Sequence, residues 1–453
     1  MSDHDHITEP HTNSLHTRRA FLRTSMLGAA AAWSLPVFLE KTFLALDVQA
    51  ADSLIQTATG KDGTILVVLQ MAGGNDGLNT VIPYADDAYH SARPVIGIGA
   101  DKAIKLTDYI GLHPKLTGLK SIYDEGHLSI IQGVGYPNPN RSHFRSTEIW
   151  QTAADADKVE TYGWLGRYFD SCCKGADPTV GVAIGNEMPQ SFAAANPTGV
   201  SFSRPEQYRW INGPRGADGS SSEALYKELN QPEDISAGGA AANDGGSIGM
   251  ISGGGAKQDN SNPLDFLQRT AMDAQMSSDK IIEISKKYKS TVEYPKGQIA
   301  DSLSLVARMI AGGLPTRVYY VSQGGYDTHT NEAPTHDRLM GELGDSLQAF
   351  CNDLKAQGNF NRVMVMTFSE FGRRVAQNAS NGTDHGAAAP MFVLGGAAKA
   401  GLFGQYPSLT NLNGGDLIYN VDFRSVYATI LERWLKAPSQ VVLGRKFPLM
   451  PIV

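Results

Sequence analysis

The stretch RVYYVSQGGYDTHTNEA, from Arg317 to Ala333, joins an apolar run to a polar loop. The run Val318–Ser322 is continuously apolar and rich in branched residues, which predicts a strand buried on both faces. Two glycines end it, and Asp327 and His329 follow directly. Carboxylates and imidazoles are common metal ligands, so the stretch predicts a metal-binding loop after a buried strand. A loop held by ordinary hydrogen bonds would show the same residues.

The same kind of apolar run recurs along the chain. We predict four further strands, at Ile65–Met71, Leu128–Val134, Val363–Phe368 and Met391–Leu394. Between the strands lie segments of helical periodicity, at Pro114–Tyr123, Ser146–Ala154, Leu264–Tyr288, Ile299–Ala311, His336–Leu354 and Phe423–Leu435. This alternation predicts an α/β fold with a mostly parallel central sheet and helices on both faces.

The first 50 residues have the pattern of an export signal. Arg18 and Arg19 precede Phe21 and Leu22, the apolar segment Met26–Leu39 follows, and a signal-peptidase site ends at Ala50. The pattern resembles a twin-arginine signal, although an arginine pair can precede an apolar run by chance. It predicts the twin-arginine translocase as a partner during export and a periplasmic or secreted location.

Composition limits the remaining function classes. The chain has 453 residues, of which 42% are hydrophobic and 19% charged, with a net charge of −7 and no long basic run beyond the leader. Nucleic acid is therefore not an expected partner. No later segment has the ~18 to 20 apolar residues of a membrane helix, so we expect a mature form that does not span the membrane. The cysteines form no CxxC pattern, which argues against thiol redox chemistry.

Residues 51–453 are expected to form a single α/β domain. The segment from Glu233 to Asn262 consists mainly of Gly, Ala, Ser, Asn and Asp, and this composition buries little apolar surface. We interpret it as a flexible surface insertion at about residues 233–262. A boundary between two domains is the alternative.

Polar residues gather where the predicted strands end. In parallel α/β sheets, ligands bind beyond the carboxyl ends of the strands. Residues of this kind follow four strands and precede the fifth: Asp76, Arg141, Ser142, His143, Arg145, Asp327, His329, Glu370, Asp384 and His385. Carboxylate oxygens mixed with imidazole nitrogens suit Zn²⁺, Mn²⁺ or a similar divalent ion.

Each of these positions also has a structural interpretation. Asp76 lies in an Asn-Asp-Gly sequence typical of turns, and Ser142 is placed to cap a helix. Glu370 is close enough in sequence to pair with Arg373 or Arg374 across a turn. The convergence of all the positions on strand ends favours a common site.

Several motifs occur in a recognisable order. After the twin-arginine leader come GGNDGLNT (73–80), RSHFRS (141–146) with Trp150 downstream, GGYDTH (324–329), TFSEFGRR (367–374) and TDHG (383–386). This series resembles the exported bacterial family DUF1501, a domain of unknown function related to the alkaline phosphatase and sulfatase superfamily. The resemblance implies an alkaline-phosphatase-like fold.

The resemblance also implies roles for individual residues. Ser142 matches the nucleophile of the superfamily, Asp76 a ligand of one metal, and Asp327, His329 and His385 the ligands of another. Ser369 and Glu370 stand where the superfamily commonly has Asp-His, and Glu370 is expected to ligate.

These roles predict an exported, metal-dependent hydrolase of a phosphate or sulfate ester. Arg141 or Arg145 would hold the anionic ester, with His143 beside them. His336 is the substitute ligand if His329 turns away. The alternative is a non-catalytic periplasmic protein that keeps the fold for binding, which the altered Ser369-Glu370 position favours.

Overall fold

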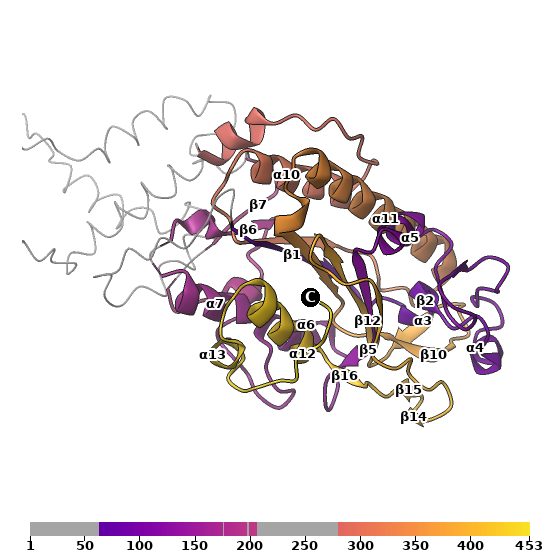
Figure 1. The fold of residues 1–453 in the computed structure, drawn as a ribbon. Helices are drawn as coiled ribbons and strands as arrows, with labels where there is room; N and C mark the ends of the chain where they lie inside the picture. The colour runs from indigo at the N-terminus through magenta and orange to yellow at the C-terminus, as the bar shows by residue number, and fades with distance from the viewer. Residues whose placement is uncertain (1–62, 175, 197–198, 206–279) are drawn as a thin grey trace, which may run out of the picture. The chain divides into compact units, whose positions relative to one another are not determined.

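The computed structural model describes residues 63–174, 176–196, 199–205 and 280–453 (Figure 1). The chain divides into two units, and all described residues belong to the unit formed by residues 41–209 and 273–453. The predicted export signal at residues 1–50 and the glycine-rich segment at 233–262 lie outside the described residues. Of the predicted helix Leu264–Tyr288, residues 280–288 are described; residues 280–287 are helical and Tyr288 is not.

The strands predicted from apolar runs form the centre of a nine-stranded sheet. Strand β1 (Ile65–Met71) pairs in parallel with β8 (Val318–Gln323) on one side and with β9 (Val363–Phe368) on the other. All seven residues of β1 are buried. A continuous apolar run fits this position because both faces of the strand are covered.

The sheet has the order β13-β5-β12-β9-β1-β8-β6-β7, and β16 also pairs with β5. The remaining strands of this sheet are β5 (Leu128–Gly135), β6 (Gly181–Ile184), β7 (Val200–Phe202), β12 (Ala389–Gly395), β13 (Gly401–Phe403) and β16 (Val421–Asp422). Among the described strands of the sheet, β12 runs antiparallel to its neighbours β5 and β9, and the other pairings are parallel. The predicted mixed α/β fold with a mostly parallel sheet is confirmed.

Helices cover both faces of the sheet (Figure 1). One face carries α5 (Thr117–Asp124), α10 (Gln298–Ala311) and α11 (Glu332–Ala356). The other carries α6 (His143–Thr152), α7 (Trp164–Cys172), α12 (Phe423–Thr429) with its π-helical continuation Ile430–Trp434, and α13 (Ser439–Leu443). Short elements complete the chain before α5: α3 (Gly77–Thr80), β2 (Val81–Ile82), α4 (Asp87–Ala92), β3 (Ile104–Lys105) and β4 (Gly111–Leu112).

Aromatic packing holds α6, α7 and α12 on their face of the sheet. The ring of Trp150 stacks on Phe423 with centroids 4.3 Å apart, and Trp164 stacks on Tyr427 at 4.4 Å. All four side chains are buried and belong to the same apolar cluster as Leu66 of β1. Since α6 begins at His143, this packing also fixes the position of that histidine.

The direction of β12 decides which loops meet. Because β12 is antiparallel, its first residues lie at the same edge of the sheet as the carboxyl ends of β5, β9, β1 and β8. The segment before β12 is a hairpin of β10 (Arg373–Gln377) and β11 (Thr383–His385). The sequence before β12 and the sequences after the parallel strands therefore converge at one edge.

Two further observations bear on the sequence predictions. Cys172, Cys173 and Cys351 are free thiols, and the last two are buried. Within the described ranges, no helix combines the length and the apolar character that crossing a membrane requires.

Candidate metal centre

Three predicted residues converge at the edge of the sheet. His143, Asp327 and His385 each offer one ligand atom, and these atoms lie within 4.8 Å of one another. Nε2 of His385 is 3.2 Å from Oδ1 of Asp327, and Nε2 of His143 is 3.5 Å from Oδ2. The residues come from the start of α6, the loop after β8 and the end of β11. We name them the histidine-carboxylate group.

Both histidines of the group are oriented by a hydrogen bond at the far side of the ring. Nδ1 of His143 donates to Oε1 of Glu370 at 2.8 Å, and Nδ1 of His385 donates to the carbonyl oxygen of Arg141 at 2.8 Å. A neutral imidazole that donates from Nδ1 carries a lone pair on Nε2. Nε2 of His143 is buried without a hydrogen-bond partner. Metal-ligating histidines show this pairing of one nitrogen with an oxygen and the other with the ion.

His329 lies beside this group but shares its lone pair with an arginine. Its Nδ1 is 3.3 Å from Oδ1 of Asp384, and its Nε2 is 2.9 Å from Nε2 of His385. Nη1 of Arg373 also approaches that Nε2, at 3.4 Å. Two imidazole lone pairs repel at such a distance unless a proton or a metal ion lies near them. With one proton between the two nitrogens, the contact of His329 with His385 is a hydrogen bond whose donor depends on the tautomer.

Asp327 is kept ionised by buried hydrogen-bond donors. Nη2 of Arg373 donates to Oδ1 of Asp327 at 2.8 Å and to the carbonyl of Tyr326 at 2.9 Å. Partial burial acts to raise the pKa of Asp327, but the hydrogen bond and the charge of Arg373, together with the contact to His385, outweigh it and lower the pKa to about 2. Arg373 also donates to the carbonyl of Thr383 at 2.9 Å, so it joins the loop after β8 to strand β11.

Glu370 lies behind His143 and does not face the centre of the group. Its side chain is buried, and Oε1 accepts hydrogen bonds from Nδ1 of His143 and from the backbone N–H of Gly73 at 2.8 Å. Gly73 has φ +120°, and a Cβ atom there would lie 2.5 Å from the backbone nitrogen of Asp327. A glycine is required because the loops after β1 and β8 approach so closely. Glu370 therefore orients a candidate ligand.

Ser142 is an exposed residue between Arg141 and His143 in the chain. It precedes α6 as its N-cap residue, but its side chain makes no capping hydrogen bond. Its neighbours both reach the group, since the carbonyl of Arg141 holds His385 and His143 is a member. Arg145 turns elsewhere, with Nη1 2.7 Å from Oε2 of Glu148.

Asp76 belongs to a separate, fully buried cluster. Its Oδ1 accepts from Nη2 of Arg93 at 2.9 Å, and its Oδ2 accepts from Nη1. Burial acts to raise the pKa of Asp76, but Arg93 outweighs it and holds the pKa below its usual range. Nearby, Nε2 of His336 is 3.2 Å from Oδ1 of Asn75, and burial lowers the pKa of His336 to about 3.

A second carboxyl group completes this arrangement. Oε2 of Glu332 accepts from Oγ1 of Thr383 at 2.6 Å, while Oε1 is buried and has no donor. Burial, and then the negative charge of Asp76, raise the pKa of Glu332 to about 9. As a neutral acid, Glu332 can donate a hydrogen bond to Asp76, which satisfies the buried oxygen. We name Asp76, Arg93, Glu332 and His336 the buried cluster.

The chain shows limited similarity to known proteins. Residues 222–445 match the family model DUF1501, described as a protein of unknown function. This range contains the motifs at 324–329, 367–374 and 383–386, whereas those at 73–80 and 141–146 precede it. No curated protein matches the chain.

Among solved structures, the chain is similar to the sulfatase PsFucS1 from Pseudoalteromonas sp., with 10% identity, a TM-score of 0.34, and coverage of 92% of this chain and 74% of that one. It is also similar to the lipoteichoic acid synthase LtaP from Listeria monocytogenes, with 9% identity, a TM-score of 0.32, and coverage of 85% of this chain and 73% of that one. A third similar structure is that of a protein in the alkaline phosphatase superfamily from Vibrio parahaemolyticus, with 9% identity, a TM-score of 0.30, and coverage of 82% of this chain and 71% of that one. Similarity at this level assigns no activity to the chain.

Three functionally placed residues have no ligand-like signal in the sequence. The sequence suggests Arg373 as a partner of Glu370, but in the structure Arg373 pairs with Asp327. Arg93 lies in a segment without a motif. Glu332 lies in the stretch Arg317–Ala333, but nothing in that sequence marks it as a buried carboxyl group. A buried arginine cannot be distinguished from a surface one by its sequence neighbours, so no signal identifies these partners.

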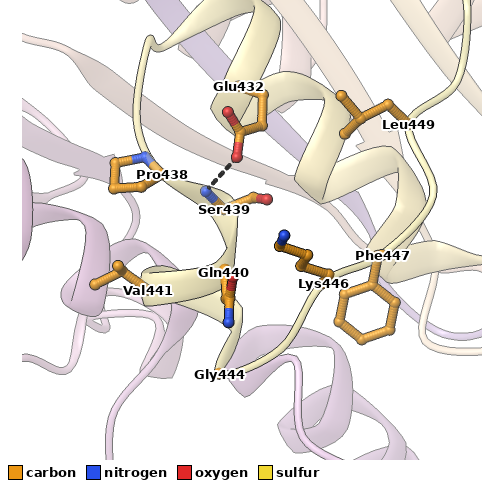
Figure 2. Close-up of a pocket in the computed structure, with 9 residues that line it drawn as sticks. All are labelled: Glu432, Pro438, Ser439, Gln440, Val441, Gly444, Lys446, Phe447 and Leu449. Carbon is orange, nitrogen blue, oxygen red and sulfur yellow. Dashed lines mark hydrogen bonds between the residues drawn. The ribbon is translucent and has the colours of Figure 1, made fainter.

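A pocket elsewhere on the surface is separate from this site. It has a volume of about 520 Å³ and lies at the C-terminal part of the chain (Figure 2). Residues of and around α13 line it, among them Ser439, whose backbone N–H donates to Glu432 (Figure 2). None of its lining residues belongs to the histidine-carboxylate group.

Proposed function

We propose that the protein is a metal-dependent hydrolase of a phosphate or sulfate ester, with a divalent ion held by His143, Asp327 and His385. The proposal rests on one observation: ligand atoms that can accept but not donate a hydrogen bond lie close together. Two Nε2 lone pairs face a carboxylate that is ionised at neutral pH, and one of these nitrogens is buried without a partner. These residues fit a metal ion because a cation at their centre would interact favourably with both lone pairs and with the carboxylate.

The donor set favours zinc or manganese. Two imidazoles and one carboxylate are ligands common to both, and three protein ligands leave an open coordination position for substrate. A bound ion of this kind polarises an ester oxygen and lowers the pKa of a nearby hydroxyl.

Ser142 is the proposed nucleophile. Its hydroxyl is exposed, makes no capping hydrogen bond and follows Arg141 immediately in the chain. The N-terminus of α6 would supply backbone N–H donors to the negative oxygens of the ester. The resemblance of the motifs to the alkaline phosphatase and sulfatase superfamily supports the same assignment.

One metal ion is a better proposal than two. The second would need Asp76, but both oxygens of that carboxylate are bound by the guanidinium of Arg93, which already balances its charge. Glu370 and Asp384 are proposed to orient His143 and His329 by hydrogen bonds to Nδ1.

Metal content and turnover test the proposal together. The purified full chain should retain about one Zn²⁺ or Mn²⁺ ion and hydrolyse 4-nitrophenyl phosphate or 4-nitrophenyl sulfate. Ser142→Ala should abolish turnover and keep the ion, while Thr330→Ala, which removes an exposed hydroxyl from the loop after β8, should do neither. Activity that survives in Ser142→Ala would remove the nucleophile assignment. A thermal stability unchanged by chelator and by added ions would favour the non-catalytic binding protein instead.

We also infer export by the twin-arginine translocase, which carries folded proteins. The supporting observation is the sequence pattern around Arg18 and Arg19. Replacing both arginines by lysine in a bacterial host should leave the full-length protein in the cytoplasm, whereas wild type is recovered outside the inner membrane. Equal recovery of both from the periplasm would contradict the signal.

A further inference from the structure

We propose that Arg141 and Arg374 form a subsite for a second anionic group on the substrate, next to the histidine-carboxylate group. The inference rests on the proposed function, because it adds a substrate class to it. The substrate would be an ester whose alcohol part carries a carboxylate, a sulfate or a phosphate of its own.

A buried carboxylate holds the two arginines. Asp416 is the first residue of β15 (Asp416–Leu417), which forms a hairpin with β14 (Leu412–Asn413). Its side chain is only 3% exposed. Nη2 of Arg141 donates to Oδ2 of Asp416, and Nε of Arg374 is 3.8 Å from Oδ1. Two guanidinium groups therefore converge on one carboxylate.

Asp416 does not use all the hydrogen-bond donors of the two arginines. Two guanidinium groups share one carboxylate, and Oδ1 of Asp416 has no hydrogen-bond partner. The side chains of Arg141 and Arg374 remain 44% and 38% exposed. Since a guanidinium has five N–H donors, each arginine keeps donors for an anion from solution. Asp384 also interacts with the charge of Arg374, so the free donors of the two partly exposed guanidinium groups are what suits oxyanions.

The arginines are adjacent to the proposed reaction centre. The carbonyl oxygen of Arg141 accepts the hydrogen bond that orients His385. Arg374 follows Arg373, which lies opposite His385 in the β10-β11 hairpin and bonds to Asp327. A substrate whose ester lies at the histidine-carboxylate group would thus extend another anionic group over Asp416.

The backbone below the subsite is fixed by the buried cluster. Nη2 of Arg93 donates to the carbonyl oxygen of Arg374 at 2.9 Å, and Nε donates to that of Val375 at 2.8 Å. Arg93 is itself bound to Asp76. Strand β10 is therefore positioned before a ligand arrives, which reduces the conformational entropy that binding has to remove.

Binding of three matched probes tests the subsite without catalysis. Benzenephosphonate and its meta and para carboxy derivatives cannot be hydrolysed at the C–P bond in such a site, and their affinities for zinc-supplemented full chain are measured by calorimetry. We expect the better carboxy derivative to bind about tenfold more tightly than benzenephosphonate to wild type. Raising the salt concentration should weaken this preference, because both arginines are partly exposed.

The variants assign the preference to the arginines. Arg141→Ala, which keeps the carbonyl that orients His385, and Arg374→Ala should each reduce the preference to about twofold or less. Arg445→Ala is the matched control, since it removes another half-exposed arginine that pairs with an aspartate, Asp155, and should keep the full preference. Equal binding of all the probes to wild type, or a preference unchanged in both variants, would overturn the subsite.

The outcomes separate this inference from the proposed function. A preference that depends on both arginines, without turnover of any phosphate or sulfate ester, would retain the anion subsite and remove the hydrolase. Turnover of an ester together with equal affinity for the probes would retain the hydrolase and remove the anion subsite. If the arginines only stabilise the loops, the variants will lower the melting temperature and leave the preference as it is in wild type, which also overturns the subsite.

Discussion

The histidine-carboxylate group and the buried cluster contain similar residue types at the same edge of the sheet, yet they differ in what they can bind. In the first, Asp327 shares one oxygen among Arg373, His329 and His385, and its side chain is 49% exposed. In the second, the buried Asp76 has both oxygens bound by Arg93. A carboxylate at a strand end is available as a ligand only where no guanidinium covers both of its oxygens.

The histidines differ in the same way. His385 has one nitrogen held by a carbonyl and the other directed at Asp327. His336 is buried, and its Nε2 is occupied by Asn75. Position after a strand is common to the ligand-like carboxylates, so the partners of each side chain decide whether it belongs to a binding site or to the protein interior.

Removing one histidine from each region should give the largest contrast. His385→Ala should lose the bound ion and reduce ester hydrolysis on the order of 10³-fold, because the ion is expected to supply several kcal/mol of stabilisation in the transition state. His336→Ala should keep the ion and most of the activity. Elemental analysis and turnover of 4-nitrophenyl phosphate measure both effects. Loss of the ion in both variants would mean that the two regions form a single site.

The buried cluster should instead respond in stability. Arg93→Met leaves Asp76 buried without its cation, and we expect the free energy of unfolding to fall by about 3 kcal/mol. Urea denaturation measures this change. Arg445→Met, which removes an exposed ion pair with Asp155, should change it by less than about 1 kcal/mol. If the two variants lost similar amounts of unfolding free energy, burial of Asp76 would not make its pairing with Arg93 more important than an exposed ion pair.

The residue behind His143 should affect metal affinity without being a ligand. Glu370→Gln removes the charge that accepts from Nδ1 of His143, and we expect zinc to bind about 10- to 100-fold more weakly. Competition with a chromogenic chelator measures the affinity. Glu342→Gln is a control on the surface of α11, where the carboxylate pairs with Arg338, and it should leave the affinity unchanged. Complete loss of the ion in Glu370→Gln would indicate direct ligation by Glu370.

The last contrast is a pH dependence that belongs to the buried cluster. Glu332 keeps its proton in the folded state up to about pH 9, whereas its ordinary pKa is 4.5. Between these values the unfolded state binds fewer protons at this residue, so its contribution to stability decreases as the pH rises. Glu332→Gln should remove this decrease, which thermal melts at pH 5, 7 and 8.5 would show. A steeper decrease in the variant would mean that Glu332 is ionised when folded.

The sequence predicts the fold well because strands buried on both faces are continuously apolar. Ile65–Met71 and Val363–Phe368 were predicted with the bounds that the structure has. Helix starts were less accurate, since α6 begins at His143 and not at Ser146. The antiparallel direction of β12 was not predicted, because an apolar run carries no information about which way the strand points.

The structure brings some of the predicted site residues together and separates others. Asp327 and His385 lie together, and His143 joins them with its Nε2 toward Asp327, while Glu370 is hydrogen-bonded to its other nitrogen. Asp76 lies apart because Arg93, seventeen residues later in the chain, reaches back to it. Long-range pairings of this kind depend on side-chain directions that the local sequence does not encode.

The direction and position of β12 also set the order in which the site can be completed. This strand lies between β5 and β9, so the two halves of the sheet stay unconnected at that point until residues 389–395 have been synthesised and inserted. His143 follows β5 in one half, and Asp327 follows β8 in the other. Insertion of β12 joins the halves and brings His385 with it, so we expect affinity for the ion to develop late in folding, after most of the sheet has formed.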